Sequence, residues 1–384
     1  MTDAPAATIE THASIAEIGR KDWDQLANPE GEPYNPFIAF DFLDVMERSG
    51  SARAETGWQP AHLTLKTGGE LRGVMPAYLK GHSQGEYLFD HAFADAWARA
   101  GGRYYPKLLS AVPFTPATGR RVLAPSTEDR RLLLAGYAQL AERMGVSGAN
   151  INFLSEEEGA LAESLGYALR FGEQFHFEDE GFGDWEGFLA ALSSRKRKDL
   201  RKERASVAES DLTIEWITGS DIEERHLDAF WWFYQDTGAR KWGSPYLTRS
   251  AFEMLAERLA DRLLFILARR GEEYVAGAMN MIGGDTLYGR YWGCTEHIPF
   301  LHFELCYYQA IDYALAHGLT RVEAGAQGEH KVARGYKPVA VRSVHKMTDP
   351  RFHEAVADYV EREREAVGQE IAFMAEHTPF RKTP

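Results

Sequence analysis

Cysteine is nearly absent from this 384-residue sequence, which has only Cys294 and Cys306. So few cysteines cannot form the disulfide framework of a small secreted domain, and their scarcity favours a reducing, cytoplasmic environment. The two cysteines are twelve positions apart and lack the Cys-x-x-Cys spacing that is typical of structural zinc sites. The sequence therefore predicts neither disulfide bonds nor a bound metal.

The sequence also lacks long apolar runs and an excess of positive charge. No apolar stretch approaches the roughly 20 residues that cross a bilayer. Residues 1–19 have neither the basic nor the apolar region of a secretory signal. The formal net charge is −14, which disfavours nucleic acids, tRNA included, as partners of the whole molecule. We therefore expect a cytoplasmic protein. A local basic patch could still bind the surface of the inner membrane, so a peripheral contact is an open alternative.

A chain of this length exceeds one typical hydrophobic core, and its hydrophobic content of 44% is enough for two domains. One pattern occurs twice. Residues 61–79 and residues 262–282 each predict two strands joined by a tight turn, with Gly73 and Gly277 at matching places in the second strands. This repetition indicates an internal duplication. Two unrelated mixed domains that share common turns are the alternative.

A second pattern is repeated near the end of each half. A helical segment ends at Gly145 and is followed by the strand-like ANINFL, and another ends at Gly318 and is followed by RVEAG. Glycine is the preferred residue just beyond a helix C-terminus. We therefore predict an α+β (mixed α/β) fold with two tandem domains, residues 1–180 and 181–384, each a twisted mixed sheet flanked by helices.

Titratable residues concentrate between Tyr288 and Pro338, at the ends of the predicted elements. The turn GAQGEHK carries Glu329, His330 and Lys331 side by side, and its glycines allow a ligand to approach closely. We predict His330 as a general base or orienting group, Glu329 as its acidic neighbour and Lys331 as a ligand for an anionic group. A solvated turn with incidental charges is the alternative.

The helix that follows the preceding loop adds His302 and Glu304 as further catalytic candidates. These residues are two positions apart, so their side chains point to different helix faces and a direct dyad is not expected. The helix dipole also favours a carboxylate in the first turn, which is the alternative explanation for Glu304. On the strand before the loop, Arg290 and Trp292 are predicted to contact the substrate.

The first half contributes a polar segment between two predicted strands, where the sequence has little helical or strand periodicity. Loops of that length in compact domains often form binding loops or lids. The proline and aromatic residues suit an ordered apolar wall for an acyl chain or a lipid-like acceptor, although plain packing explains the aromatic residues equally well. The residues predicted to bind substrate here are His82, Glu86, Asp90, Tyr104, Tyr105 and Lys107.

A strongly basic helix is predicted from Ser193, with the sequence SSRKRKDLRKER. Arginine and lysine bind phosphate groups readily. We therefore predict that Arg195, Lys196 and Arg197 hold the phosphates of CoA, a nucleotide-linked acceptor or an anionic membrane surface. A solvated helix face is the alternative.

Several long motifs resemble a known family. They are NPFIAFDFLDVMERSG, HSQGEYLFD, YYPKLLSAVPFTPATGRRVL, HFELCYYQAIDYA and GAQGEHKVARGYKP. Over nearly the whole chain, the sequence resembles the bacterial FemAB-like family of peptidoglycan biosynthesis or recognition, within the tandem form of the GNAT acyltransferase superfamily. Some of its members resemble the bacterial ceramide synthases, which acylate a sphingoid amine.

This resemblance implies an N-acyltransferase in which an amine attacks an acyl carbonyl, with acyl-CoA or an acyl carrier protein supplying the acyl group. The product would be an amide on an envelope or lipid amine. An inward-pointing glutamate is a familiar base on a GNAT strand, which makes Glu323 another catalytic candidate.

The sequence departs from ordinary CoA-binding GNAT domains at one point. Neither half carries the Arg/Gln-x-x-Gly-x-Gly/Ala loop that holds the pyrophosphate. Two alternatives therefore stay open, a Fem-type aminoacyl transferase acting on a peptidoglycan precursor and a non-catalytic module that binds such a precursor. The adjacent acid, imidazole and ammonium of the GEHK turn favour an enzyme.

Overall fold

The computed structural model of the protein describes residues 6–241, 245–326 and 328–381, apart from the side chains of residues 238–241 and 329. The chain divides into two compact units. Unit 1 contains residues 1–172 and 340–369, and unit 2 contains residues 173–339 and 370–384. The first division lies close to the predicted boundary at residue 180, but the C-terminal segment that belongs to unit 1 was not foreseen.

Unit 1 is a mixed α/β domain. In chain order it contains β1 (Ala7–His12), α1 (Arg20–Ala27), α2 (Phe40–Arg48), β2 (Trp58–Pro60), β3 (His62–Thr67), β4 (Glu70–Met75), β5 (Tyr78–Lys80), α3 (His91–Arg99), β6 (Lys107–Ser110), α4 (Thr127–Met144), β7 (Gly148–Leu154) and α5 (Glu156–Ser164). The chain ranges of β8 (Ala168–Glu178), β14 (Lys337–Met347) and α12 (Pro350–Glu376) each include residues of both units.

The strands of unit 1 form two groups. β1, β3 and β4 are antiparallel neighbours. The second group has the order β2-β5-β6-β7-β14, in which β6 and β7 run parallel and the other neighbours run antiparallel. Because β14 pairs with β7, the strand that completes this group comes from near the C-terminus of the chain.

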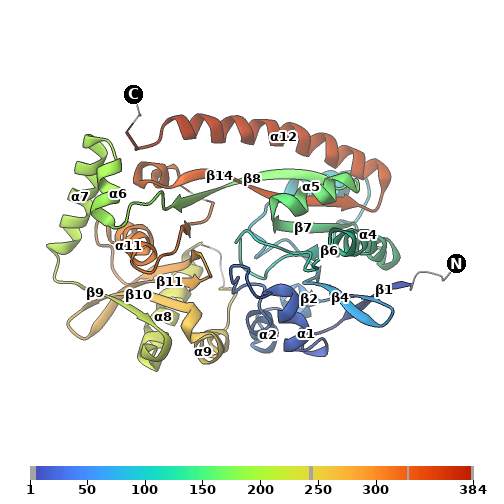
Figure 1. Cartoon of the computed structure of the whole chain (residues 1–384), viewed down its shortest axis with the longest axis horizontal. Helices are drawn as coiled ribbons and strands as arrows, with labels where there is room; N and C mark the ends of the chain where they lie inside the picture. The colour runs from blue at the N-terminus through green and yellow to red at the C-terminus, as the bar shows by residue number, and fades with distance from the viewer. Residues whose placement is uncertain (1–5, 242–244, 327, 382–384) are drawn as a thin grey trace. The chain divides into compact units, whose positions relative to one another are not determined.

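Helix α4 provides much of the core of unit 1, where it lies against β7 (Figure 1). It buries Leu133 and Tyr137 in the same apolar cluster as side chains of β3 and β7. Ser126 caps its N-terminus by accepting a hydrogen bond from the backbone N–H of Asp129, and Gly145 ends it in the left-handed region with φ of 65°.

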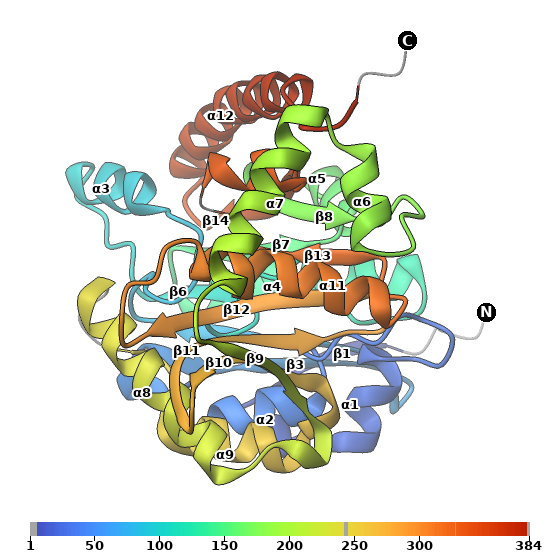
Figure 2. The same ribbon diagram turned by 90° about the vertical axis from the view of Figure 1, so that its left-hand side faces the viewer.

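Unit 2 repeats this plan. It contains α6 (Trp185–Ala191), α7 (Ser194–Ala208), β9 (Thr213–Thr218), α8 (Glu224–Lys241), α9 (Arg249–Arg258), β10 (Leu263–Arg270), β11 (Glu273–Ile282), β12 (Thr286–Cys294), α10 (Leu301–Phe303), a π-helical segment (Glu304–Tyr308), α11 (Gln309–Ala316), β13 (Arg321–Glu323) and the 3₁₀ helix η6 (Glu329–Arg334). Its strand order is β8-β13-β12-β11-β10-β9, with β12 and β13 parallel. Helices α8 and α9 cover one face of these strands and α11 covers the other (Figure 2).

The two units match in detail. Gly73 lies opposite Leu65 in the β3–β4 hairpin, and Gly277 lies opposite Leu267 in the β10–β11 hairpin. A helix and a parallel strand follow in each unit, and Gly318 just beyond α11 has φ of 68°. These correspondences confirm the predicted fold of two tandem GNAT-like domains, each a mixed sheet flanked by helices.

The polar segment of the first half is more regular than its sequence indicates. It contains helix α3 and strand β6, where the sequence predicted an irregular loop. Phe93 of α3 is buried, and Trp97 stacks on Phe352 of α12 with ring centroids 4.5 Å apart. Packing against a distant helix, which no local pattern reveals, therefore stabilises this helix. None of the described helices combines the length and apolar content that a membrane crossing requires.

Candidate functional site

A cavity of about 130 Å³ lies in unit 2, beside the place where two parallel strands stop pairing. β12 and β13 are paired as far as Tyr288 and Glu323, after which β13 ends while β12 continues to Cys294. The cavity is bounded by β11, β12, the beginning of the helix at residues 301–308, and Ala324. Its lining residues are Ala278, Met279, Asn280, Gly289, Arg290, Tyr291, Trp292, His302, Cys306, Tyr307 and Ala324.

A β-bulge shapes one wall of this cavity. Met279 of β11 lies opposite Tyr291, whereas Asn280 lies opposite Gly289, so Arg290 is an extra residue in β12. Such a bulge redirects the side chains next to it. The predicted substrate contacts Arg290 and Trp292 both line the cavity.

The start of the helix after β12 forms another wall. The His302 ring lies edge-on to Trp292 and to Tyr307, with centroids 5.1 and 5.4 Å away. Cys306 and Tyr307 belong to the π-helical segment, and both line the cavity. Short π-helical segments recur at functional sites because they offset side chains from the regular helical positions. The structure thus places His302 at the cavity.

His330 contacts Tyr307 of this same wall. Its Nε2 lies 3.1 Å from the Tyr307 hydroxyl, and its ring lies 5.4 Å from that of Phe303. The His330 side chain is exposed, and its partial desolvation, together with Arg334 and Lys331, lowers the pKa of its imidazole. His330 thus contacts a cavity residue while remaining open to solvent. Glu329, the predicted acidic neighbour, has its side chain outside the described part of the structure.

Lys331 points away from its neighbour His330. It is buried, and its Nζ donates hydrogen bonds to the carbonyl oxygens of Ala324 and Gly325, at 2.7 and 3.1 Å. Burial lowers the pKa of its ammonium to about 8. These contacts tie η6 to the end of β13, and the predicted role in binding an anionic group stays a prediction.

Glu323 is buried at the end of β13, next to a second histidine. Its Oε2 lies 4.0 Å from Nε2 of His176 on β8. Burial, with help from Arg321 and Lys331, lowers the pKa of His176 to about 3, so the imidazole is uncharged. Unit 1 has an Asn150–His345 pair at the corresponding place, joined by a hydrogen bond of 2.8 Å.

Glu304 serves another part of the molecule. Its Oε1 accepts hydrogen bonds from Arg204 of α7 at 2.9 Å and from Gln309 at 2.7 Å. It is not among the residues that line the cavity. His302 and Glu304 thus contact different neighbours, as their spacing predicts, and the position of Glu304 suits an ion pair that anchors the basic helix.

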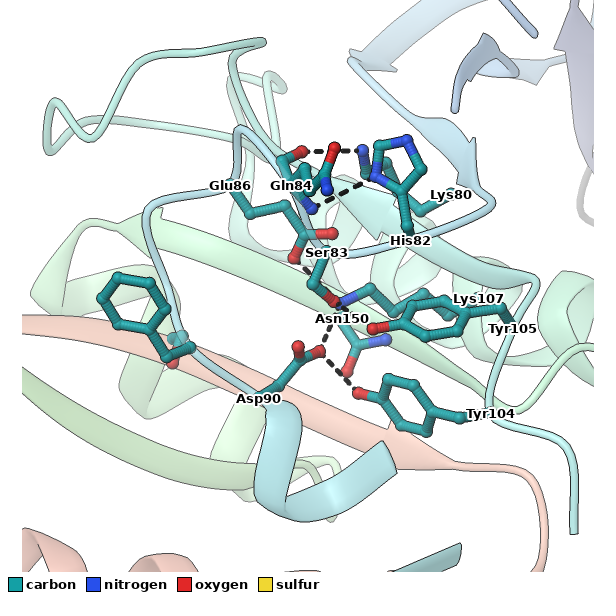
Figure 3. Close-up of polar contacts among 12 residues, drawn as sticks. Lys80, His82, Ser83, Gln84, Glu86, Asp90, Tyr104, Tyr105, Lys107 and Asn150 are labelled. Carbon is teal, nitrogen blue, oxygen red and sulfur yellow. Dashed lines mark hydrogen bonds and ion pairs between the residues drawn. The ribbon is translucent and has the colours of Figure 1, made fainter. Parts of the chain in front are cut away.

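The predicted substrate residues of the first half gather in a separate, buried cluster in unit 1 (Figure 3). Lys107 Nζ donates to Glu86 at 2.8 Å and also to Asp90, which accepts a hydrogen bond of 2.7 Å from the Tyr104 hydroxyl. Lys107 Nζ also donates to Ser83 Oγ at 2.9 Å. We call Glu86, Asp90, Tyr104 and Lys107 the Lys107 cluster.

Two other predicted residues lie at the margin of the Lys107 cluster. The Tyr105 hydroxyl lies 2.8 Å from Ser83 Oγ, and His82 Nδ1 accepts a hydrogen bond of 3.2 Å from the backbone N–H of Gln84. These contacts hold the loop that leads into α3. They are internal to unit 1, so substrate binding by this set stays a prediction.

Electrostatics of the Lys107 cluster depend on close pairing. Burial raises the pKa of Asp90, but Lys107 outweighs that effect and lowers it to about 2. The neighbouring Lys80 differs: burial lowers its pKa to about 7, and its Nζ lies 3.7 Å from the centre of the Trp58 ring.

The basic helix α7 borders a hollow of about 310 Å³ in unit 2. Lys196, Lys202 and Arg334 of η6 line it, together with the carboxylates of Asp199 and Glu203. Arg195 is exposed, whereas Arg197 donates a hydrogen bond of 3.4 Å to the carbonyl of Leu192. Of the three predicted phosphate ligands, Lys196 therefore lines the hollow. Within the described part of the chain, no three His, Cys, Asp or Glu side chains are arranged to hold a metal.

Sequence reasoning missed several residues of these sites. Tyr307 and Cys306 were hidden in an apparently regular helix, and Lys80 looked like an ordinary strand end. Asn280 carried a usable signal, since it is a lone polar residue within the apolar strand sequence VAGAMNMI. His176 gave no such signal, because it alternates with two phenylalanines and lies between Gln174 and Glu178 in QFHFE, as in an ordinary half-exposed strand.

Comparison with solved structures supports the fold. FemX matches with a TM-score of 0.56 at 14% identity, covering 91% of this chain and 100% of FemX. The C-terminal domain of a candidate lysylphosphatidylglycerol synthetase from Agrobacterium fabrum matches with a TM-score of 0.54 at 11% identity, covering 91% of this chain and 97% of that domain. L-PGS from Bacillus licheniformis matches with a TM-score of 0.51 at 12% identity, covering 86% and 98% of the two chains. These identities show a shared fold and no more.

Sequence comparison then identifies the family. No curated protein matches the sequence. The family model FemAB-like, described as peptidoglycan biosynthesis/recognition, matches residues 14–382, nearly the whole chain. The chain therefore belongs to the FemAB-like family.

Proposed function

We propose that this protein is an N-acyltransferase that forms an amide on an envelope or lipid amine, as the bacterial ceramide synthases do, and that the reaction takes place in the unit 2 cavity. The observation that carries the proposal is the cavity itself, which lies where the pairing of the parallel strands β12 and β13 ends and where a β-bulge and His302 meet. The acyl donor in this proposal is acyl-CoA or an acyl carrier protein.

Residues at the cavity suit each step of acyl transfer. The amine nitrogen attacks the acyl carbonyl carbon, so that a C–N bond forms and the C–S bond to the donor thiol breaks. His302, which lines the cavity, takes the proton from the attacking nitrogen and returns it to the departing thiolate. His330 contacts the Tyr307 hydroxyl and so orients a second cavity residue.

The lysines of the hollow beside α7 suit the anionic part of the donor. Lys196 and Lys202 form no ion pair within the described residues, whereas Arg334 is bound in a bidentate pair with Glu203. Unpaired lysines on a protein of net charge −14 favour phosphate groups over other ligands. Charge reversal at Arg195, Lys196 and Arg197 is expected to weaken donor binding and flatten its salt dependence, and an unchanged salt dependence would contradict this part of the proposal.

A second candidate function rests on the description of the family. Peptidoglycan biosynthesis/recognition favours a Fem-type aminoacyl transferase that acts on a peptidoglycan precursor. The net charge disfavours tRNA as the donor. A non-catalytic module that binds the same precursor is the third possibility, and it predicts binding without turnover.

The test uses the purified 384-residue chain. It is incubated with palmitoyl-CoA or palmitoyl-acyl carrier protein and sphinganine, and the products are analysed by mass spectrometry. We expect N-acylated sphinganine, at least a 100-fold loss of turnover in His302→Ala and a smaller loss in His330→Ala. His377→Ala is the matched control, because His377 is exposed near the end of α12 and far along the chain from the cavity residues.

Analysis of a deletion strain separates the three functions. Loss of an N-acylated lipid supports the first function, and altered muropeptide bridges support the second. If both the lipids and the muropeptides are unchanged, the binding module is favoured. Full turnover in both histidine variants would remove these side chains from the mechanism.

A further inference from the structure

Asn280 is the most unusual polar residue at the unit 2 cavity. It lies on β11, is 1% exposed, and lines the cavity. Its Nδ2 has no hydrogen-bond partner within the described part of the chain. A buried amide donor without a partner is costly to folding and rare in native proteins, so it requires an explanation.

The fold keeps the space in front of this amide open. The residue opposite Asn280 is Gly289, which has no side chain to cover it. A Cβ atom at Gly289 would lie 3.7 Å from Asn280 Oδ1 and 3.3 Å from the carbonyl oxygen of Glu323. Any larger side chain at this position would therefore enter the gap between Asn280 and the end of β13.

The cavity volume fits a small polar group. About 130 Å³ corresponds to roughly four water molecules at about 30 Å³ each, enough for a carbonyl and its neighbouring atoms. The unpartnered group is an N–H donor, so the missing partner is a hydrogen-bond acceptor. The acceptor that the proposed reaction brings to this place is the acyl carbonyl oxygen, which becomes negatively charged as the amine attacks.

We propose that the Asn280 carboxamide donates a hydrogen bond to the acyl carbonyl oxygen and stabilises the oxyanion that forms on it. This inference rests on the proposed acyl transfer and deepens it by assigning the oxyanion donor. The amine adds to the carbonyl carbon and the C–O π electrons move to oxygen. The hydrogen bond from Asn280 Nδ2 stabilises the negative charge that results. They return when the C–S bond breaks and the thiolate leaves with the proton from His302.

The decisive variant is Asn280→Leu, which has nearly the same shape and no polar atoms. A preformed oxyanion donor acts mainly in the transition state, so kcat is expected to fall about 100- to 1,000-fold while KM for palmitoyl-CoA changes less than about threefold. Because the substitution also removes an unpartnered buried donor, its melting temperature is expected to stay equal or rise.

Asn152→Leu provides the matched control. Asn152 is likewise 1% exposed and has unpartnered side-chain atoms, but it lies on β7 of unit 1. We expect equal or higher stability there as well, with kcat unchanged. A structural role of buried amides in general would affect both variants alike.

A spectroscopic measurement tests the contact without turnover. Infrared difference spectra of palmitoyl-CoA labelled with ¹³C at the carbonyl should show a carbonyl band shifted to lower frequency on wild type, and that shift should be absent on Asn280→Leu. If wild type transfers acyl groups while Asn280→Leu keeps its kcat and its carbonyl band, the assignment of Asn280 is wrong and the proposed function stands. If wild type transfers no acyl group from either donor, the proposed function and the assignment both fail.

Discussion

Lys107 provides the most direct test of how unit 1 is held together. Its side chain is 1% exposed, and its ammonium is shared between Glu86 and Asp90, whose side chains are 1% and 2% exposed. Each carboxylate also has one oxygen without a partner in the described residues. Replacing Lys107 with methionine keeps the length of the side chain but leaves two buried carboxylates with no cation at that place.

The expected cost follows from the burial of this group. Removing one partner of a buried ion pair costs about 3–5 kcal/mol, because the remaining charge is uncompensated. A domain of this size loses roughly 2–4 °C of melting temperature per kcal/mol, so the expected fall is about 6–20 °C. Burial already raises the pKa of Glu86. Without Lys107 both carboxyl groups would take up protons in the folded state more readily than in the unfolded state. The difference in the free energy of unfolding between wild type and Lys107→Met should therefore shrink as the pH falls below about 5.

Urea denaturation at pH 7 and pH 4.5, followed by tryptophan fluorescence, measures the loss of unfolding free energy and its dependence on pH. Thermal denaturation at pH 7 measures the fall in melting temperature. The control is Lys66→Met, which removes a surface ion pair whose side chains are 35% and 48% exposed and which should leave the midpoint unchanged within error. A loss below about 1 kcal/mol at pH 7 in Lys107→Met, or a difference that widens on acidification, would refute this account of the cluster.

Three further predictions concern other contacts. Arg204→Met should lower the free energy of unfolding by about 2–4 kcal/mol, because it leaves the buried Glu304 without its cation. The cost is below that of a fully buried pair because the Arg204 side chain is partly exposed. Urea denaturation measures this loss, and an unchanged stability would contradict the ion pair. Gly293→Ala should cost about 1–3 kcal/mol, since a Cβ there would lie 2.3 Å from the backbone oxygen of Phe233; a wild-type melting temperature would contradict this close approach. Burial lowers the pKa of His345 to about 3. Between about pH 6.5 and 3 the unfolded state therefore binds a proton that the folded state does not. The free energy of unfolding falls by about 1.4 kcal/mol per pH unit on acidification in that range. In His345→Gln this slope should be smaller, and equal slopes in urea titrations from pH 7 to pH 4 would show that His345 is not the group responsible.

The sequence predicted the fold well because turn and helix-cap residues, which depend only on their neighbours in the chain, mark the duplication. Gly73 and Gly277 mark equivalent positions in two hairpins, and Ser126 and Gly145 mark the two ends of α4. Caps and tight turns depend on one or two residues and their neighbours, so they can be read without knowledge of distant contacts.

The candidate site was only partly predictable. His302, Arg290 and Trp292 were predicted, and they do line one cavity. The adjacency of His330 and Lys331 in the sequence was misleading, because neighbouring residues of a 3₁₀ helix point in different directions, and Lys331 is turned inward to two backbone carbonyls.

The remaining features depend on tertiary structure. The bulge that places Arg290 at the cavity arises from the pairing of β11 with β12. The amino-acid sequence of β12 alone does not reveal it. The Lys107 cluster likewise gathers residues from a loop, a helix end and a strand, whose charges looked like those of a binding loop. In each case the decisive contact joins residues that are distant in the chain.

The exchange of strands between the halves of the sequence has a consequence for biosynthesis. β7 emerges from the ribosome almost two hundred residues before its antiparallel neighbour β14, which pairs with it from Arg342 to Met347. Until then one hydrogen-bonding edge of β7 has no partner strand, a state that invites association with other chains. A nascent or truncated chain that stops at residue 180 would therefore need protection by a chaperone, and expression of the first half alone should yield aggregates in place of an independent domain.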